Sequence, residues 1–417
     1  MSPLEFNAGA GLRYGALGFA LAFVALPLYV SLPAHYAAEY GVPLAALGAL
    51  LLGARLFDAL VDPWIGRFSD RLLNGAPGRV RAVMAAAALL LLGGFVGLFF
   101  PLPRALTPLL VWCGGFLLMT YLGFSALSVM HQAWGARLGG SSVQQTKVVA
   151  WREGLALAGV IAASVLPSLV GLASTALALA AALALGLILL NSAPRAAAKP
   201  VEHTPASLAW KTPGFARLLA VFLLNGIAAA VPATLLLFFV RDRLQTPAAE
   251  GLYLAAYFIA AAASLPLWLK LVARLGQARA WGIGMLLAVA AFAWAAVLGA
   301  GDQWGFTVVC VASGAALGAD VAIPGAMLAR VIQQAGLEGR AEGAFFGWWN
   351  AANKLNLALA AGLALPLLQA LGYAPGQRGP QALQALGLAY CVLPCVLKLA
   401  AAALLYLFWI RPKEITA

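Results

Sequence analysis

Charged residues are scarce in this chain. Lys, Arg, Asp and Glu make up 10% of its 417 residues, whereas hydrophobic residues make up 63%. A soluble protein of this length must cover a large surface with polar side chains, so this composition excludes an ordinary soluble domain. Runs of about 20 apolar residues recur along the sequence, and a helix of that length crosses the hydrocarbon core of a bilayer. The composition therefore predicts a polytopic α-helical membrane protein.

Cysteine is also rare, and no catalytic motif stands out. The four cysteines all lie within apolar runs, which favours packing over a disulfide framework or a metal site. There is no marked Ser/His/Asp grouping, phosphate-cradling loop or metal cluster, so we expect neither an enzyme nor a cofactor. The net charge of +12 is spread singly or in pairs over short loops, without an aromatic-interleaved basic patch. This pattern argues against a nucleic-acid partner.

The apolar runs predict about twelve membrane-spanning helices. Their expected ranges are 12–36, 43–67, 80–101, 105–136, 147–170, 172–192, 215–240, 248–272, 280–300, 304–333, 341–371 and 381–410. Between the sixth and seventh lies the one long polar stretch, whose Pro, Lys, Glu and His content is typical of a linker. We therefore expect a first six-helix bundle over 1–193, a cytoplasmic linker over 194–213 and a second six-helix bundle over 214–417.

The positions of lysine and arginine predict the orientation. With the N-terminus in the cytoplasm, the loops on the opposite side hold only Arg104, Arg241, Arg243 and Arg378, and the other loop and tail cations lie inside. The positive-inside rule then places both termini in the cytoplasm of a cell whose inner membrane holds the chain. The first apolar run lacks a charged leader and a small-residue cleavage site, so we expect it to be retained as a span.

A basic loop follows the second predicted span. The segment "GRFSDRLLNGAPGR" resembles the G-x-x-x-D-R…G-[RK] loop signature of the major facilitator superfamily, with Gly66, Asp70, Arg71, Gly78 and Arg79 in the matching places. A second basic, Gly-containing loop, 268–282, occupies the same place in the second half. The resemblance implies the superfamily's fold, an all-α membrane protein whose two six-helix bundles surround a central cavity.

Ionisable residues within the predicted spans are costly in hydrocarbon, each by roughly 2.5–3.5 kcal/mol at the bilayer centre. Three of them, Arg55, Asp58 and Asp62, share one face of the second predicted helix, because they are spaced by three and four residues. Two such close acids in a low dielectric must share a proton, pair with a cation or bind a metal ion. We therefore predict a site that alternately holds and releases one H⁺ or Na⁺.

The same segment resembles the glycoside–pentoside–hexuronide:cation symporter family, whose helix 2 carries R-x-x-D-A-x-x-D-P-x-x-G. Here the pattern matches Arg55, Asp58, Asp62, Pro63 and Gly66. The resemblance implies that the two aspartates form the cation site. "FFGWWNAANKLNLALAAG" resembles helix 11 of the family and places Lys354 near the cation and substrate sites. "YLGFSALS" and "WREGLALAG" resemble helix 4 and the start of helix 5, where Arg152 matches a family arginine.

Four positions depart from the family. The two carboxylates that hold the sugar correspond to Ala22 and Ser125, and two polar cation ligands correspond to Val61 and Leu122. A Na⁺ site needs several oxygen ligands, whereas a proton needs a single carboxylate, so we favour H⁺ over Na⁺ as the coupling ion. The loss of both sugar-holding acids indicates a less polyhydroxylated, or even partly apolar, substrate.

Further polar residues are expected to line the substrate pathway. Arg152 and Glu153 are adjacent and should point about 100° apart on a helix, so they need not pair with each other, and Arg152 could meet Asp58 or Asp62. Asp320 is a lone acid that we expect to pair with Lys354, and Lys398 is a lone cation without a close acid in the sequence. The predicted substrate-binding residues are Tyr121, Ser125, Ser128, Arg152, Glu153, Asn225, Asp320, Trp349 and Asn350.

These patterns favour a cation-coupled symporter that moves a small organic solute, sugar-like or glycoside-like by family resemblance, through alternating access. Its partners would be the solute and the lipid bilayer, and no oligomer is required. Two alternatives remain open. A transporter of lysolipids or other amphipathic solutes would keep the fold and change the cargo. A non-transporting membrane assembly factor would use the buried charges only for packing.

Overall fold

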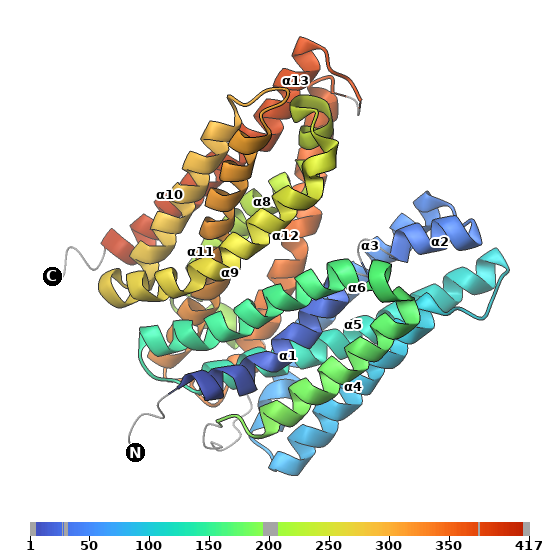
Figure 1. The fold of residues 1–417 in the computed structure, drawn as a ribbon. Coiled ribbons are helices and arrows are strands. Elements are labelled where there is room, and N and C mark those ends of the chain that lie inside the picture. The colour runs from blue at the N-terminus through green and yellow to red at the C-terminus, as the bar shows by residue number, and fades with distance from the viewer. Residues whose placement is uncertain (1–5, 27, 29–31, 195–206, 374–375, 412–417) are drawn as a thin grey trace. The chain divides into compact units, whose positions relative to one another are not determined.

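The structure, a computed structural model, describes residues 6–26, 28, 32–194, 207–373 and 376–411 (Figure 1). Within these residues it is helical, with no strand. The first half contains α1 (Ala8–Leu26), α2 (Leu32–Tyr40), α3 (Leu44–Leu73), α4 (Pro77–Phe99), α5 (Leu106–Arg137), α6 (Ser142–Asn191) and the short α7 (Leu208–Lys211). The second half contains α8 (Phe215–Phe238), η2 (Phe239–Leu244), η3 (Pro247–Ala249), α9 (Glu250–Leu275), α10 (Gln277–Ala295), α11 (Gln303–Gln334), α12 (Glu342–Ala370), α13 (Pro380–Gly387), η4 (Leu388–Val392), α14 (Leu393–Leu405) and η5 (Tyr406–Ile410).

Within the residues that the structure describes, each predicted span coincides with helical structure. Among the described residues, eight helical stretches are long and apolar enough to cross a membrane: Pro77–Phe99, Leu106–Arg137, Leu169–Asn191, Phe215–Leu244, Pro247–Leu275, Gln277–Ala295, Gln303–Gln334 and Pro380–Ile410. The others are covered by α1 with α2, α3, the first part of α6 and α12. The all-α membrane fold is therefore confirmed.

Two helices differ in detail from the predicted ranges. The fifth and sixth spans form one continuous element, α6, but Gly171 has a φ of 77° and a ψ of 169°, so the helical path breaks where the sequence indicated. The second span was expected to end at residue 67, yet α3 continues to Leu73. Asp70 therefore lies in the last turn of a helix and not in a loop, because only the part of a helix inside the bilayer must be apolar.

The chain divides by its internal contacts into two compact units. The first unit comprises Met1–Thr212 with Ala329–Ala351, and the second comprises Pro213–Leu328 with Ala352–Ala417. The helices α11 and α12 thus contribute residues to both units. The predicted linker falls largely on residues 195–206, which lie outside the described residues. Its boundaries stay a prediction.

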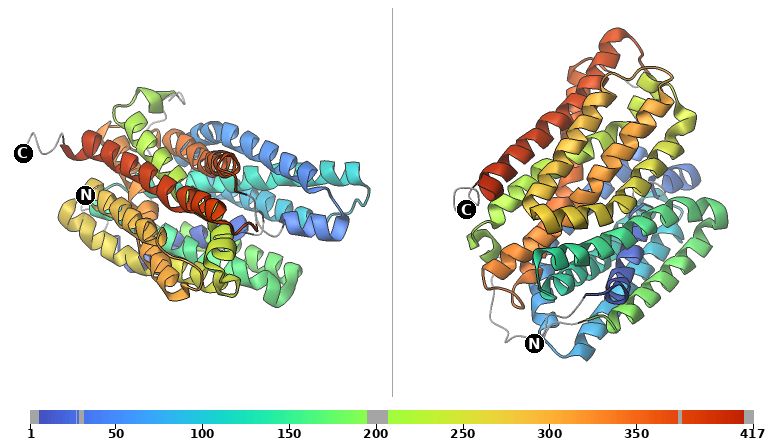
Figure 2. Two further views of the ribbon diagram at one scale, coloured as in Figure 1. Left: turned by 90° about the horizontal axis from the view of Figure 1, so that it is seen from above. Right: turned by 60° about the vertical axis from the view of Figure 1, so that its left-hand side comes forward.

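Within the first unit, α1 lies along α6, α4 along α5, and α3 along α5 (Figure 2). Small residues allow the close approach of α1 and α6. A Cβ on Gly15 would lie 2.7 Å from the carbonyl oxygen of Trp151, and one on Gly18 would lie 2.7 Å from that of Arg152. Glycine at such contacts lets two helix backbones approach closely, which is how helices associate where lipid supplies no hydrophobic driving force.

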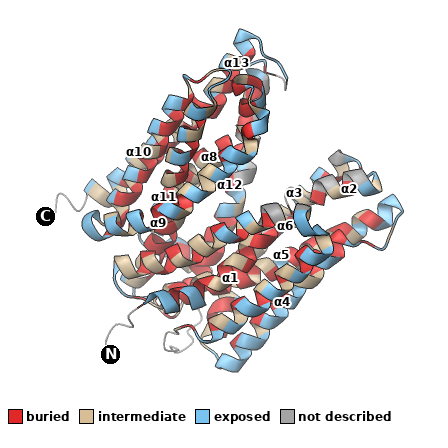
Figure 3. Ribbon diagram, viewed as in Figure 1, coloured by how far each residue is buried: buried red, intermediate tan, exposed pale blue. Residues whose placement is uncertain are grey.

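Within the second unit, α14 packs against α8 and α10. Each unit has its own apolar core. One core runs from Phe6 to Ala193 and the other from Val231 to Cys391. Many helices bury one side and expose the other, as the colouring by burial shows (Figure 3). Some polar side chains are also buried on these helices, and they form the sites described next.

Candidate functional sites

The two predicted cation-site acids lie on α3 and are both buried. Asp58 is 3% exposed and Asp62 is 0% exposed, one helical turn apart. Arg55, one turn before Asp58, is half-buried. Pro63 follows Asp62 inside the helix and has no N–H to donate to the carbonyl of Ala59, which leaves the backbone locally less constrained.

Ser125 on α5 completes this acid cluster. Its hydroxyl donates a hydrogen bond to Oδ1 of Asp58 at 2.6 Å, and both side chains are buried. A hydrogen bond of this length from a hydroxyl to a carboxylate is typical of charge-assisted pairs. Ser125 was predicted to bind substrate. The structure brings it to the predicted cation site.

The start of α12 packs closely against Asp62. A Cβ on Gly347 would lie 2.6 Å from the backbone oxygen of Asp62, so only glycine allows this approach without a shift. One turn later, Asn350 accepts a hydrogen bond of 3.0 Å from Nε2 of Gln132 on α5, and Trp349 is buried. Two predicted substrate-binding residues thus lie in the first unit, on a helix segment that contacts both α3 and α5.

The interpretation of Arg152 and Glu153 as diverging side chains is wrong. On α6, Nη2 of Arg152 lies 2.6 Å from Oε1 of Glu153, and its Nε donates to the same oxygen at 3.0 Å. The Cβ atoms of adjacent helix residues diverge, but both side chains are long enough to curl together. The ion-pair partner of Arg152 is therefore Glu153 and not Asp58 or Asp62.

The remaining predicted substrate residues of the first unit lie on α5. Tyr121 and Ser128 are both buried, and with Ser125 they follow one helix face. One turn beyond Ser128, Nε2 of His131 lies 2.8 Å from the backbone oxygen of Tyr14 on α1, and the Tyr14 hydroxyl donates to the backbone oxygen of His131 at 3.0 Å. This reciprocal pair ties α1 to α5 within the first unit.

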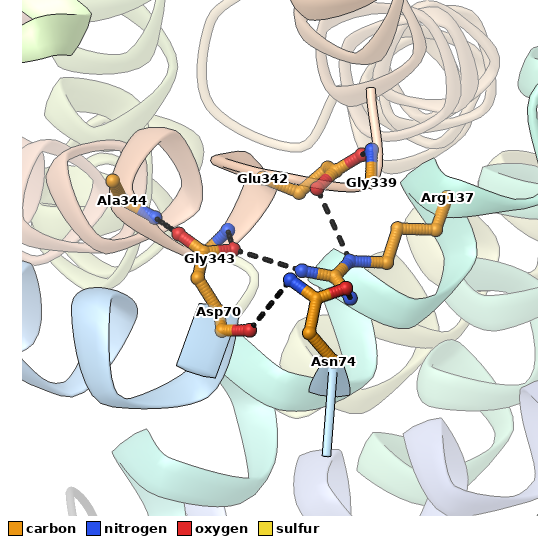
Figure 4. A network of polar contacts seen from close by, with 7 residues as sticks. All are labelled: Asp70, Asn74, Arg137, Gly339, Glu342, Gly343 and Ala344. Carbon is orange, nitrogen blue, oxygen red and sulfur yellow. Dashed lines mark hydrogen bonds and ion pairs between the residues drawn. The ribbon is translucent and has the colours of Figure 1, made fainter. Parts of the chain in front are cut away.

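A polar network that the sequence indicated only in part surrounds Asp70 (Figure 4). The carboxylate of Asp70 accepts hydrogen bonds from the backbone N–H groups of Gly343 at 2.7 Å and Ala344 at 2.8 Å. These groups belong to the first turn of α12, where N–H groups lack partners within the helix and the helix dipole favours an anion. Asp70 thereby caps α12 from the end of α3.

Arg137, the last residue of α5, joins this network to a second acid. Its Nη2 lies 3.2 Å from Oδ1 of Asp70, and its Nε lies 3.1 Å from Oε2 of Glu342 (Figure 4). All three side chains are at most 6% exposed. Glu342 also accepts a hydrogen bond from the backbone N–H of Gly339, and Arg137 donates to the side chain of Asn74.

Two buried carboxylates therefore share one arginine. Asp70 lies beyond the predicted span 43–67, near the end of the helix. Burial raises the pKa of Asp70 to about 7, the charge of Arg137 opposes this, and the nearby Glu342 adds to the rise. Sequence reasoning identified Asp70 through the loop signature and missed Arg137 and Glu342. A buried acid requires a cation close to it, and this requirement was the signal that could have pointed to Arg137.

The second unit holds a separate polar cluster around Asp320 on α11. Nζ of Lys398 on α14 lies 2.8 Å from Oδ2 of Asp320. Oδ1 of Asp320 accepts hydrogen bonds of 2.9 Å from Asn225 on α8 and from Trp281 on α10, and Lys398 donates to Asn225 at 2.8 Å. The expected pairing of Asp320 with Lys354 is wrong. Lys398 is the partner, because α14 packs against α8 and α10 and so brings its cation to the same place.

Lys354 is half-buried on α12 and belongs to the second unit, whereas Asp58 and Asp62 belong to the first. Its role beside the cation site stays a prediction. Asn225 and Asp320, predicted to bind substrate, are brought together by the structure. Among the sequence-predicted residues, the structure therefore joins Ser125 to Asp58 in the first unit and Asn225 to Asp320 in the second.

The sequence profile of the family described as "MFS/sugar transport protein" matches residues 11–411. Among curated proteins there is no match. Three solved structures are similar over nearly the whole chain. A bacterial homologue of the iron transporter ferroportin, in an outward-facing state, has a TM-score of 0.70 and 18% identity, covering 96% of this chain and 99% of that one.

The second is FucP, a major facilitator superfamily transporter and fucose:proton symporter of E. coli, with a TM-score of 0.68, 14% identity and coverage of 94% and 98%. The third is the human organic anion transporter MFSD10, with a TM-score of 0.63, 16% identity and coverage of 97% and 100%. At these identities the structural likeness establishes the fold alone. The predicted all-α membrane protein of the major facilitator fold is confirmed.

Proposed function

Because the chain belongs to the MFS/sugar transport protein family, it is a membrane transporter and not an enzyme, and we propose that it is a cation-coupled symporter for a small organic solute. The observation that carries this proposal is the buried pair Asp58 and Asp62 on α3, with the Ser125 hydroxyl bonded to Asp58. Two acids one turn apart in a low dielectric repel each other when both are ionised. A bound cation lowers the free energy of that arrangement.

The proposed mechanism is alternating access. A cation that binds at Asp58 and Asp62 favours the state that binds solute, and the loaded protein then exposes both to the other side of the membrane. Linkage requires the cation and the solute to raise each other's affinity by the same factor. The finer assignment to the glycoside–pentoside–hexuronide:cation symporters, with an inner-membrane location and cytoplasmic termini, forms part of this proposal.

We favour H⁺ as the coupling ion. Val61 and Leu122 occupy the places where the resembling family has polar ligands. A proton requires one carboxylate, whereas Na⁺ requires several oxygens at short range.

A less polyhydroxylated cargo, including an amphipathic solute such as a lysolipid, is the second candidate. Ser125 stands where the resembling family has a carboxylate that holds sugar. In this structure its hydroxyl donates its one hydrogen to Asp58. Uptake of labelled sugars and of labelled lysophosphatidylcholine by proteoliposomes separates the two cargoes.

The test of coupling uses de-energised proteoliposomes and a panel of monosaccharides, glycosides and lysolipids. Adding a transported solute should move H⁺ into the vesicles, which a pH electrode detects as alkalinisation of the medium. Asp58→Asn and Asp62→Asn should abolish this signal. Asp302→Asn, which changes an exposed acid before α11, should retain it. A normal H⁺ signal from either α3 variant would refute the proposal, and a Na⁺ electrode response in place of the H⁺ signal would identify Na⁺ as the coupling ion.

A further inference from the structure

The second unit contains a cavity of about 140 Å³ beside the Asp320–Lys398 pair. Every residue that lines it belongs to this unit. The walls come from α8, α9, α10, α11 and η4, and Lys398 of α14 lies at one side. Leu254 on α9 lines the cavity and is 41% exposed.

Aromatic rings form much of the wall. Tyr253, Phe292, Phe306 and Tyr390 all line the cavity, and they contact one another at ring-centroid distances of 4.8 Å for Tyr253 with Phe306 and 5.9 Å for Phe292 with Tyr390. Rings arranged in this way offer both faces and edges to another ring, which favours tilted or edge-to-face contact with an aromatic ligand. An apolar cavity of about 150 Å³ can hold a benzene molecule.

An ion pair with no net charge forms the charged part of the cavity wall. Among the residues that line the cavity, Asp320 and Lys398 carry the charges, and they compensate each other at 2.8 Å. Asp320 already accepts hydrogen bonds from Lys398, Asn225 and Trp281, three of the about four that a carboxylate can accept. The ammonium of Lys398 has three hydrogens, of which Asp320 and Asn225 take two. One donor therefore remains at the cavity wall.

We propose that this cavity binds a neutral, single-ring aromatic compound that carries one hydrogen-bond acceptor, with a phenol as the simplest example. The ring packs against the aromatic side chains of the wall, and the acceptor oxygen takes the third hydrogen of Lys398. A carboxylate is disfavoured because it adds an uncompensated negative charge beside a pair that is already neutral. The volume sets the size at one ring.

Binding is measured by ¹⁹F NMR with the purified full chain in lipid nanodiscs, and protein-free nanodiscs give the partitioning background. The probes are 4-fluorophenol, fluorobenzene and 4-fluorobenzoate. We expect saturable binding of 4-fluorophenol, binding of fluorobenzene weakened about tenfold by the missing hydrogen bond, and no saturable binding of 4-fluorobenzoate. The absence of a saturable component for 4-fluorophenol would overturn the proposal.

A matched pair of variants locates the site. Leu254 and Leu252 lie on the same helix, are each 41% exposed and project from nearly opposite sides, but only Leu254 lines the cavity. Leu254→Trp should weaken 4-fluorophenol binding at least tenfold by narrowing the cavity, whereas Leu252→Trp should leave it unchanged. Equal affinities in these two variants would place the bound probe elsewhere and refute the assignment.

The role of Lys398 is tested by removing the pair as a whole. The double variant Lys398→Met with Asp320→Asn leaves no unpaired buried charge and keeps an acceptor for Asn225 and Trp281. It should bind 4-fluorophenol and fluorobenzene with similar affinity. Retained preference for the phenol would show that Lys398 is not its donor. Asp58→Asn should bind 4-fluorophenol as the wild type does, so a failure of this inference is distinct from a failure of cation coupling.

Discussion

The hydroxyl of Ser125 lies 2.6 Å from the carboxylate of Asp58, and this hydrogen bond joins α5 to α3 inside the first unit. Both side chains are buried, so bulk water does little to solvate the polar atoms of either one. A hydrogen bond to a charged group contributes about 1.5–3 kcal/mol, which corresponds to a tenfold or larger change in an equilibrium constant. We therefore expect cation binding at Asp58 to depend on the hydrogen bond from Ser125.

Ser125→Ala is expected to change the concentration of coupling ion that gives half-maximal uptake by about tenfold or more, because Asp58 loses this donor. Initial rates of solute uptake by proteoliposomes, measured across a pH series and a Na⁺ series, provide the readout. Thr120→Ala serves as the control, since Thr120 is also buried on α5 and its hydroxyl donates to the backbone oxygen of Phe116. Identical ion dependence in the two variants would exclude a role for Ser125 in the cation site.

Much of the fold was predictable because membrane insertion imposes a local, readable rule. An apolar run of sufficient length becomes a helix, and the break at Gly171 was visible as the boundary between two such runs. The burial of Asp58 and Asp62 was also predictable, since an acid within an apolar run must face protein or a water-filled cavity. Both inferences can be drawn from residues that are neighbours in the sequence.

The partners of the buried charges were not predictable in the same way. Lys398 and Asp320 are 78 residues apart in sequence, and Arg137 and Glu342 are 205 apart. Their pairing depends on which helices pack together, and helical periodicity carries no information about that. Charge balance alone would have offered Lys398 as a partner for Asp320, but it could not choose between Lys398 and Lys354.

Replacing Arg137 by Met should destabilise the protein by about 3–5 kcal/mol, because two buried carboxylates, those of Asp70 and Glu342, would lose their shared cation. The exposed pair Arg241–Glu250 is the matched comparison, with Arg241 57% exposed. Arg241→Met should leave the unfolding midpoint nearly unchanged, since water screens such a pair. Thermal unfolding of both variants in the same detergent measures the contrast. Similar shifts in both would contradict a buried network at Arg137.

The raised pKa of Asp70 gives stability a defined dependence on pH. Burial raises it to about 7 from its ordinary value of 3.8, against the pull of Arg137 and with a further push from Glu342. Between these two values the unfolded chain releases the proton while the folded protein retains it. Stability from this group is therefore present in full below pH 3.8 and is lost as the pH rises to about 7.

Asp70→Asn should accordingly flatten the decrease of the unfolding temperature between about pH 4 and pH 7, the window of this titration. Melting curves at several pH values, with Asp302→Asn as the control, measure the slope. The control should follow the wild type, because Asp302 is exposed in the loop before α11. A wild-type melting temperature that rises through this window would contradict the assignment to Asp70.

Gly66 provides the sharpest steric test of the contact between α3 and α12. A Cβ at this position would overlap the carbonyl oxygen of Gly343, whose N–H donates to Asp70 one turn further along α3. Gly66→Ala should therefore destabilise the protein by about 1–3 kcal/mol, because the helices must separate. Gly53 on the same helix has open space around it. Gly53→Ala should be neutral or slightly stabilising, since alanine favours a helix over glycine by about 0.5–1 kcal/mol. Thermal unfolding compares the two, and a neutral Gly66→Ala would mean that α12 does not pack against α3 at this point.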